Sequence, residues 1–150
     1  MTVDLKKTKR FGVALDVTLK VIKQDLIRRF RENNIELTPE QWAVLSEVAE
    51  NESIYQRELA NSTFKDAPTV SRIIDLLCKR GLINRNPDSE DRRRFLISMT
   101  KEGREVYSQT APIMYEARMS GWNGLTDKDF NDLNRILNKI SSNISATEQS

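Results

Sequence analysis

Histidine is absent from this chain of 150 residues, and cysteine occurs only once, as Cys78. Without histidine the sequence lacks the most common general base and a common metal ligand. It also contains no glycine-rich phosphate loop, no paired catalytic carboxylates and no Cys-x-x-Cys motif. A single cysteine excludes an intramolecular disulfide. We therefore expect no enzymatic activity, no catalytic or metal-ligating residues and no cofactor.

Long apolar runs are also missing. No N-terminal stretch resembles a signal peptide, and no apolar segment reaches the roughly 18 residues needed to span a bilayer. We expect a cytoplasmic protein with no membrane partner. Hydrophobic residues make up 38% of the chain and charged residues 31%. This composition is polar for a lone compact domain and suits one subunit of an intertwined dimer.

Basic charge is concentrated in two segments. Residues 1–31 carry nine Lys or Arg and three Asp, a net +6, and residues 79–104 carry eight basic and four acidic groups, a net +4. Residues 32–66 carry two basic and eight acidic groups, a net −6. This asymmetry indicates a polyanionic partner more strongly than the overall charge of +2 does.

Long helices are predicted at both ends of the chain. Over residues 8–33 apolar side chains recur at spacings of three and four. They are Phe11, Leu15, Leu19, Ile22, Leu26 and Phe30. A helix of this length, roughly 39 Å, is too long for a small domain to bury, so we expect it to pack against a partner chain. Residues 101–144 are predicted to form two further helices, the second of them capped by Thr126, with a kink or break at Pro112 because proline has no backbone donor.

Three shorter helices are predicted between these ends. Thr38 and Gln41 form a capping box around Pro39, which starts the first of them. The stretch 53–56 repeats this capping pattern for a short helix that ends near Thr63. Its apolar positions are Leu59, Ala60 and Phe64.

The third short helix is the expected recognition helix. It follows a tight turn, begins at Asp66 and ends at Gly81. Its apolar side consists of Val70, Ile73, Ile74 and Leu77. A strand over 82–86 comes next, then a polar turn, and Arg92–Arg94 open a second, alternating strand. Two helices joined by a tight turn and followed by a strand pair make a winged helix-turn-helix. Arginines at the tip of such a wing can enter a narrow groove of DNA.

Three passages of this lobe carry a resemblance. They are residues 37–45 (LTPEQWAVL), Glu58-Leu59-Ala60 with residues 68–74 (PTVSRII), and residues 88–94 (DSEDRRR) leading to residues 98–103 (SMTKEG). Together they resemble the MarR (multiple antibiotic resistance regulator) family of bacterial transcription regulators, over about residues 9–140. The third passage is similar to the family's wing signature, an Asp-x-Arg pair followed by a Leu-Thr-x-x-Gly helix start. Met99 replaces the usual Leu, a volume-conserving change.

The resemblance implies an all-α fold with a small β-wing in an intertwined homodimer, and a chain that forms one MarR-like domain over residues 1–150. Residues 8–33 and 101–144 would be dimerisation helices, and residues 38–100 the DNA-binding lobe. The implied function is sequence-specific regulation at a pseudo-palindromic double-stranded operator, as a repressor released by a small effector. The alternative is a winged-helix module that binds protein, against which the arginine-rich tip argues.

The expected DNA contacts lie on the recognition helix and the wing. Arg72 can pair with guanine or hold a phosphate; alternatively it forms a surface ion pair with Asp75. Arg93, two residues after Asp91, corresponds to the family's minor-groove arginine, and Asp91 would brace the turn. The other candidate DNA contacts are Pro68, Thr69, Ser71, Arg92 and Arg94, with Gln56, Lys65 and Arg85 as weaker phosphate contacts.

The resemblance also implies an effector site between the dimer helices and the lobe, for a small phenolic or lipophilic molecule. The candidate residues are Trp42, Met114, Tyr115 and Met119. Such side chains are also typical of core and dimer packing, which we favour. Peroxide-sensing relatives carry a reactive cysteine in the first helix. Here Cys78 follows Leu77 in the recognition helix, and we expect a buried, inert thiol.

Overall fold

The computed structural model describes residues 2–63 and 65–148. The chain forms two compact units, Met1–Ala117 and Arg118–Ser150. Within the first, a short helix α1 (Leu5–Thr8) precedes the long helix α2 (Phe11–Glu32). The helix predicted over residues 8–33 thus begins later than expected. The chain leaves helical geometry at Arg10, whose φ is −95° and ψ is 1°.

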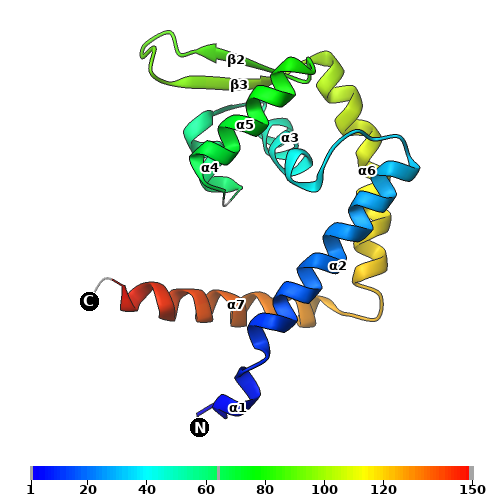
Figure 1. The fold of residues 1–150 in the computed structure, drawn as a ribbon, viewed down its shortest axis with the longest axis vertical. Helices are drawn as coiled ribbons and strands as arrows, with labels where there is room; N and C mark the ends of the chain where they lie inside the picture. Colours follow the sequence, from blue (N-terminus) through cyan, green and yellow to red (C-terminus); the bar gives the residue numbers. More distant parts are fainter. Residues whose placement is uncertain (1, 64, 149–150) are drawn as a thin grey trace. The chain divides into compact units, whose positions relative to one another are not determined.

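Three helices form the body of the lobe (Figure 1). They are α3 (Pro39–Asn51), α4 (Gln56–Ser62) and α5 (Ala67–Lys79). The capping box that starts α3 is confirmed, because the Gln41 amide donates to Thr38 Oγ1 at 3.1 Å and the Thr38 amide donates to Gln41 Oε1 at 3.1 Å. Asp66 caps α5 by accepting from the Thr69 amide at 2.9 Å. Phe64, a predicted apolar position near α4, lies outside the described residues.

The segment expected to cap α4 is instead a strand. Strand β1 (Ser53–Tyr55) pairs antiparallel with β3 (Phe95–Met99), so that Tyr55 lies opposite Leu96. Tyr55 then precedes α4 without a side-chain capping bond. The prediction missed β1 because its three residues are too few to show alternation. Burial of Ile54, which is 7% exposed, favours the strand.

The wing contains a second strand pair. Strand β2 (Ile83–Pro87) pairs antiparallel with β3, with Arg85 opposite Ile97 and Pro87 opposite Phe95. The sheet order is β1-β3-β2. Figure 1 shows the β2–β3 hairpin extending from the three helices of the lobe. The sheet therefore joins the wing to the chain segment that leads directly into α4.

The core of the first unit lies beneath this sheet. Its fully buried apolar side chains come from α3, α4, α5 and β3 and include Val44, Leu45, Val48, Leu59, Val70, Ile74, Leu77 and Ile97. Phe30, at the end of α2, is 1% exposed and packs into the same cluster. The apolar face predicted for the recognition helix is thus the face that α5 buries.

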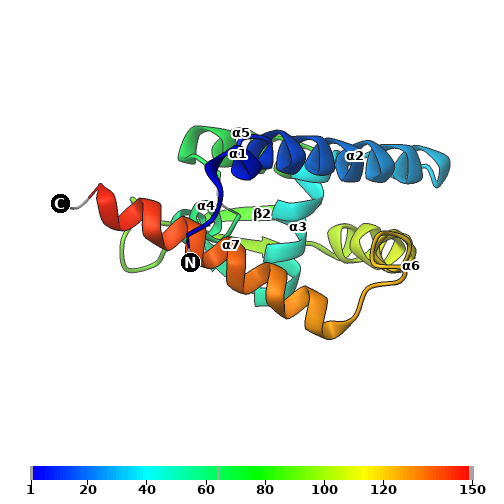
Figure 2. The same ribbon diagram turned by 90° about the horizontal axis from the view of Figure 1, so that it is seen from below.

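Helix α6 (Lys101–Gly121) follows the wing and continues through Pro112. The sequence predicted a kink or a break at Pro112. The break is wrong because the helix is continuous, and Figure 2 shows the helix changing direction along its length. Pro112 removes a single backbone donor, and the surrounding helical bonds are retained. Within residues 2–63 and 65–148, no helix is both long enough and apolar enough to cross a membrane.

Helix α7 (Asp127–Thr147) belongs to the second unit. Its predicted start is confirmed, because Thr126 and Asp129 form a capping box. Three residues of its apolar stripe stay exposed: Phe130 at 48%, Leu133 at 45% and Ile136 at 44%. The Phe130 ring meets Trp122 edge-on at 5.3 Å.

Candidate nucleic-acid interface

The first turn of α5 presents a polar surface. Asp66 accepts hydrogen bonds from the Thr69 amide at 2.9 Å and from Thr69 Oγ1 at 2.7 Å. The bond from the Thr69 hydroxyl is the main cause that lowers the pKa of Asp66. Arg72 is exposed, and its Nη2 lies 3.4 Å from Thr69 Oγ1. Pro68 is exposed beside them, whereas Ser71 is half-buried.

The alternative ion pair for Arg72 is not formed. Asp75 instead accepts a hydrogen bond from Arg85 Nη1 at 2.8 Å. The guanidinium of Arg72 therefore stands at the exposed start of α5 without a bond to Asp75. This is the end of a helix where backbone N–H groups and the helix dipole favour an anion.

Asp91 and Arg93 form a compact unit at the tip of the wing. The Arg93 amide donates to Asp91 Oδ1 at 3.0 Å, and Arg93 Nε donates to the same oxygen at 3.2 Å. The Arg93 side chain remains 90% exposed, against 34% for Asp91. Hydrogen bonding from the Arg93 side chain is also the main cause that lowers the pKa of Asp91. Asp91 thus braces the turn and directs an exposed arginine, as the sequence predicted.

The other wing arginines differ in their surroundings. Arg92 is exposed. Arg94 lies over the Tyr55 ring, with its Cζ 3.9 Å from the ring centroid. Arg85 lies over the Phe95 ring at 4.4 Å. Sequence reasoning found these arginines but missed their aromatic partners, since Tyr55 and Phe95 reach them only through strand pairing.

A hollow of about 900 Å³ lies between the wing, α4 and the start of α5. Six of the predicted site residues line it: Gln56, Lys65, Arg85, Asp91, Arg93 and Arg94. Its lining holds five basic side chains (Arg57, Lys65, Arg85, Arg93 and Arg94) against two acidic ones, Glu58 and Asp91. Residues far apart in the sequence are thus gathered on one basic surface that suits the phosphates of a polyanion.

The predicted effector residues are not gathered in this way. Trp42 donates from Nε1 to Thr110 Oγ1 at 2.8 Å and its ring stacks near Tyr107. Met114 is 7% exposed, whereas Tyr115 is 64% exposed. Met119 is 57% exposed and belongs to the second unit. Trp42 and Met114 therefore serve packing in the isolated chain.

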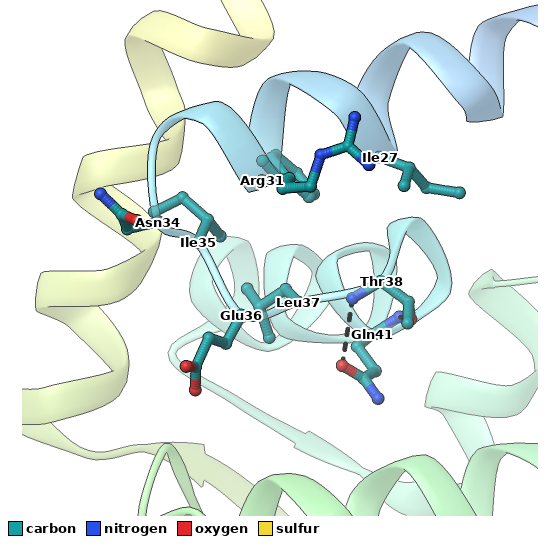
Figure 3. Close-up of a pocket in the computed structure, with 9 residues that line it drawn as sticks. Ile27, Arg31, Asn34, Ile35, Glu36, Leu37, Thr38 and Gln41 are labelled. Carbon is teal, nitrogen blue, oxygen red and sulfur yellow. Dashed lines mark hydrogen bonds between the residues drawn. The ribbon is translucent and has the colours of Figure 1, made fainter.

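A second hollow, of about 440 Å³, lies where α2 leads into α3 (Figure 3). Apolar side chains from Ile27, Phe30, Ile35 and Leu37 line it, together with the polar residues Arg31, Asn34, Glu36, Thr38 and Gln41. Figure 3 also shows the Thr38–Gln41 capping bond at its edge. None of the four predicted effector residues lines either hollow.

Cys78 is half-buried on α5. Burial raises the pKa of its thiol, an effect that the nearby Arg85 only partly opposes. The raised pKa favours the protonated, less nucleophilic thiol, but Cys78 is half-buried rather than buried as predicted.

Comparison with known proteins identifies the chain that carries this surface. A model of the MarR family matches residues 35–94. The transcriptional regulator FarR of Neisseria gonorrhoeae is 30% identical over 98 residues, which cover 64% of this chain and 67% of FarR. The chain belongs to the MarR family. The predicted family is thereby confirmed.

Further similarities extend across the MarR family. The transcriptional repressor MprA of Escherichia coli is 30% identical over 103 residues, which span 69% of this chain but only 58% of MprA. The crystal structure of a cysteine-to-serine mutant of E. coli MarR with operator DNA has a TM-score of 0.79 at 18% identity, over 93% of this chain and 99% of that one. CouR of Rhodococcus jostii, bound to p-coumaroyl-CoA, has a TM-score of 0.76 at 25% identity, over 89% and 92%. These structures confirm the mainly helical winged fold.

Proposed function

We propose that this chain is a cytoplasmic, sequence-specific DNA-binding transcriptional regulator that represses its targets. The observation that carries the proposal is the exposed Arg93, oriented by Asp91 on a wing beside a recognition helix that presents Arg72. The basic hollow between them matches the charge of a DNA backbone. Family membership supports this function, and the name of MprA supports repression.

The two elements have different tasks in this proposal. The start of α5 enters the major groove, where Arg72 reads a base, and Pro68, Thr69 and Ser71 lie close to the backbone. Arg93 enters the minor groove, and Asp91 orients it. Arg92, Gln56 and Lys65 supply phosphate contacts around them.

We propose a homodimer on a pseudo-palindromic operator. The apolar residues of α2 support it, since Leu15, Leu19 and Ile22 are 40%, 51% and 52% exposed. The stripe of α7 is similarly exposed. Exposed apolar surface of this extent is typical of an interface. Residues 8–33 and 101–144 form the dimer base in this arrangement, and residues 38–100 form the DNA-binding lobe.

The effector is a small lipophilic or phenolic molecule that releases the DNA. CouR binds p-coumaroyl-CoA, and the phenolic p-coumaroyl group of that molecule supports a ligand of this class. Of the candidate contacts in the first unit, Tyr115 is 64% exposed and open to such a ligand, whereas Trp42 and Met114 serve packing. Release requires that the ligand prefer a conformation that fits the operator poorly.

The test starts from DNA that the wild-type protein selects out of a random-sequence duplex library. Affinities for the selected duplex and for a random duplex of the same length are then measured over a range of salt concentrations. Arg72→Ala should lose about 1–3 kcal/mol on the selected duplex and relax selection at one or two positions. Arg93→Ala should weaken binding to many sequences and reduce the salt slope by about one unit.

The matched control is Arg118→Ala, which removes one exposed arginine from α6 outside this surface. It should bind both duplexes nearly as the wild type does. If the wild-type protein binds the selected and random duplexes equally at every salt concentration, sequence-specific regulation is wrong. The protein-interaction module then becomes the better explanation of the fold.

A further inference from the structure

Two arginines of the wing are held by aromatic rings and carboxylates of neighbouring elements. Arg94 stacks on Tyr55, which ends β1 and precedes α4. Arg85, in β2, stacks on Phe95 in β3. Arg94 was predicted as a DNA contact and Arg85 as a weaker phosphate contact, yet the partners observed here lie within the protein.

Arg94 connects the turn of the wing to the start of the helix-turn-helix. Its Nη1 lies 4.0 Å from Asp88 Oδ2, and the Tyr55 hydroxyl lies 3.4 Å from the same carboxylate oxygen. The Asp88 side chain is only 13% exposed. The backbone closes the same turn, because the Asp88 amide donates to the Arg94 carbonyl at 2.8 Å. We call Tyr55, Asp88 and Arg94 the outer clamp.

Arg85 connects β2 to the recognition helix. Its Nη1 donates to Asp75 Oδ1 on α5 at 2.8 Å, while its Cζ lies 4.4 Å from the centroid of the Phe95 ring. The Nε atom of Arg85 is buried and has no hydrogen-bond partner within residues 2–63 and 65–148. The ring and Asp75 therefore dictate the position of this guanidinium. We call Asp75, Arg85 and Phe95 the inner clamp.

These contacts distinguish Arg94 from its neighbour. The Arg94 side chain is 53% exposed, whereas that of Arg93 is 90% exposed. A stacked, carboxylate-facing guanidinium is partly neutralised and must leave its ring to follow a phosphate. A cation–π contact at an exposed site corresponds to about a two- to fivefold factor in an equilibrium constant. That is enough to favour one wing position over another.

We propose that the two clamps set DNA specificity by fixing the wing relative to the recognition helix. The outer clamp holds the wing turn on the start of α4, and the inner clamp holds β2 on α5. Arg94 and Arg85 are thus positioning residues that keep Arg93 at a fixed distance from the start of α5. The proposal rests on the proposed function, because a fixed distance matters only if both elements read one DNA site.

The first experiment uses the intact protein without DNA. Hydrogen exchange at the Asp88 amide reports opening of the wing turn, because this amide bonds to the Arg94 carbonyl in every variant. Arg94→Ala and Tyr55→Leu should each speed this exchange about two- to fivefold. Arg92→Ala removes the same charge from a nearby exposed arginine that is not part of the outer clamp, and it should leave the exchange rate at the Asp88 amide unchanged. Circular dichroism verifies that each variant is folded.

The second experiment uses the selected and random duplexes described above. Arg94→Ala and Tyr55→Leu should each reduce the ratio of specific to random affinity by about two- to fivefold. In the double variant, the ratio of specific to random affinity should fall no further than in the more affected single variant, because both substitutions open the same outer clamp. Arg94→Lys, which keeps the charge but lacks the flat guanidinium, should retain random-duplex affinity and lose part of the discrimination.

Two outcomes would overturn the proposal. In the first, Tyr55→Leu discriminates between the selected and random duplexes as well as the wild type does, whereas Arg94→Ala weakens binding to both duplexes equally and lowers the salt slope by about one unit. That result would identify Arg94 as a direct phosphate contact. The second is an unchanged rate of hydrogen exchange at the Asp88 amide in both Arg94→Ala and Tyr55→Leu. Hydrogen exchange is measured without DNA, so it tests the clamp separately from the proposed function. Failure of the proposed function appears instead as a wild-type protein that does not discriminate between the selected and random duplexes.

Discussion

The winged lobe and the long helices bury their apolar side chains to very different extents. In the lobe, Val44, Leu45 and Val48 of α3 are all 0% exposed. On α7, Leu133 is 45% exposed, and on α2, Leu19 is 51% exposed. Both regions follow a helical apolar period, yet only one of them closes its core within a single chain.

This difference indicates how the chain divides its tasks. The lobe has helices and a sheet on opposite sides of its apolar residues, so it can position a recognition helix and wing without help. In the proposed homodimer, the exposed stripes of the long helices pack against a second copy of the chain.

The largest expected effect comes from truncating the same side chain in each region. Leu45→Ala should reduce the free energy of unfolding by about 2–5 kcal/mol, because a fully buried leucine leaves a cavity. Leu133→Ala, at a site that is 45% exposed, should cost less than about 1 kcal/mol in dilute, monomeric protein. Urea unfolding at low protein concentration measures both. Equal losses in the two variants would contradict the distinction between a closed lobe and an open helix.

A charge on the α7 stripe should have the next largest effect. Leu133→Glu should weaken the proposed dimer at least about 100-fold, or about 2.7 kcal/mol, because a carboxylate would be buried in an apolar interface. Asn131→Glu adds the same charge to an exposed site on the other side of α7 and should leave the dimer intact. Sedimentation over a range of protein concentrations distinguishes the two. A wild-type protein that remains monomeric at micromolar concentration rules out this role for α7.

Much of this division could be predicted from the sequence. The period of α5 identified Val70, Ile74 and Leu77 as buried, and the capping pairs at Thr38 and Thr126 gave correct helix starts. These features depend on neighbours within a few residues along the chain. Local spacing is therefore sufficient to reveal them.

The features that were missed depend on residues far apart in the sequence. Strand β1 exists because Ser53 and Tyr55 pair with Ser98 and Leu96, and no local period announces that pairing. The outer clamp likewise joins Tyr55 to Arg94 across the sheet. The run of arginines in the wing was evident, but which of them stays free is decided by tertiary packing.

A glycine at the base of the wing gives the third expected effect. A Cβ on Gly103 would lie 1.9 Å from the Leu82 carbonyl oxygen, a backbone atom that cannot rotate away. Gly103→Ala should therefore cost about 1–3 kcal/mol and displace the wing from α6. Gly121→Ala, near the other end of α6, meets no atom within 4 Å and should be neutral or slightly stabilising. Thermal unfolding compares the pair, and similar melting points would contradict the close approach at Leu82.

Acid should produce the smallest effect, and it should appear in both regions. Hydrogen bonding by Thr69 lowers the pKa of Asp66, mainly through its side chain, and hydrogen bonding by Thr126 lowers the pKa of Asp129, mainly through its backbone. A carboxyl whose pKa is lower in the folded state stabilises the fold above its ordinary value of 3.8, and this contribution is lost as the pH falls through the folded value. Since histidine is absent, unfolding should depend little on pH between about 5 and 8.

Two variants separate the contributions of these caps. Asp66→Asn should speed hydrogen exchange at the Thr69 amide, and Asp129→Asn should speed it at the Thr126 amide, which donates to Asp129 Oδ2 at 2.8 Å. Each should also flatten the fall in stability below about pH 4, because the variant has no proton to bind at that site. In the lobe the change should stay confined to the first turn of α5, since Val70 and Ile74 anchor the rest of that helix in the core. In dilute, monomeric protein the faster exchange caused by Asp129→Asn should spread further along α7, because the apolar stripe of that helix is exposed. Exchange that remains confined to the first turn of α7 would contradict the view that this helix depends on a partner for its stability.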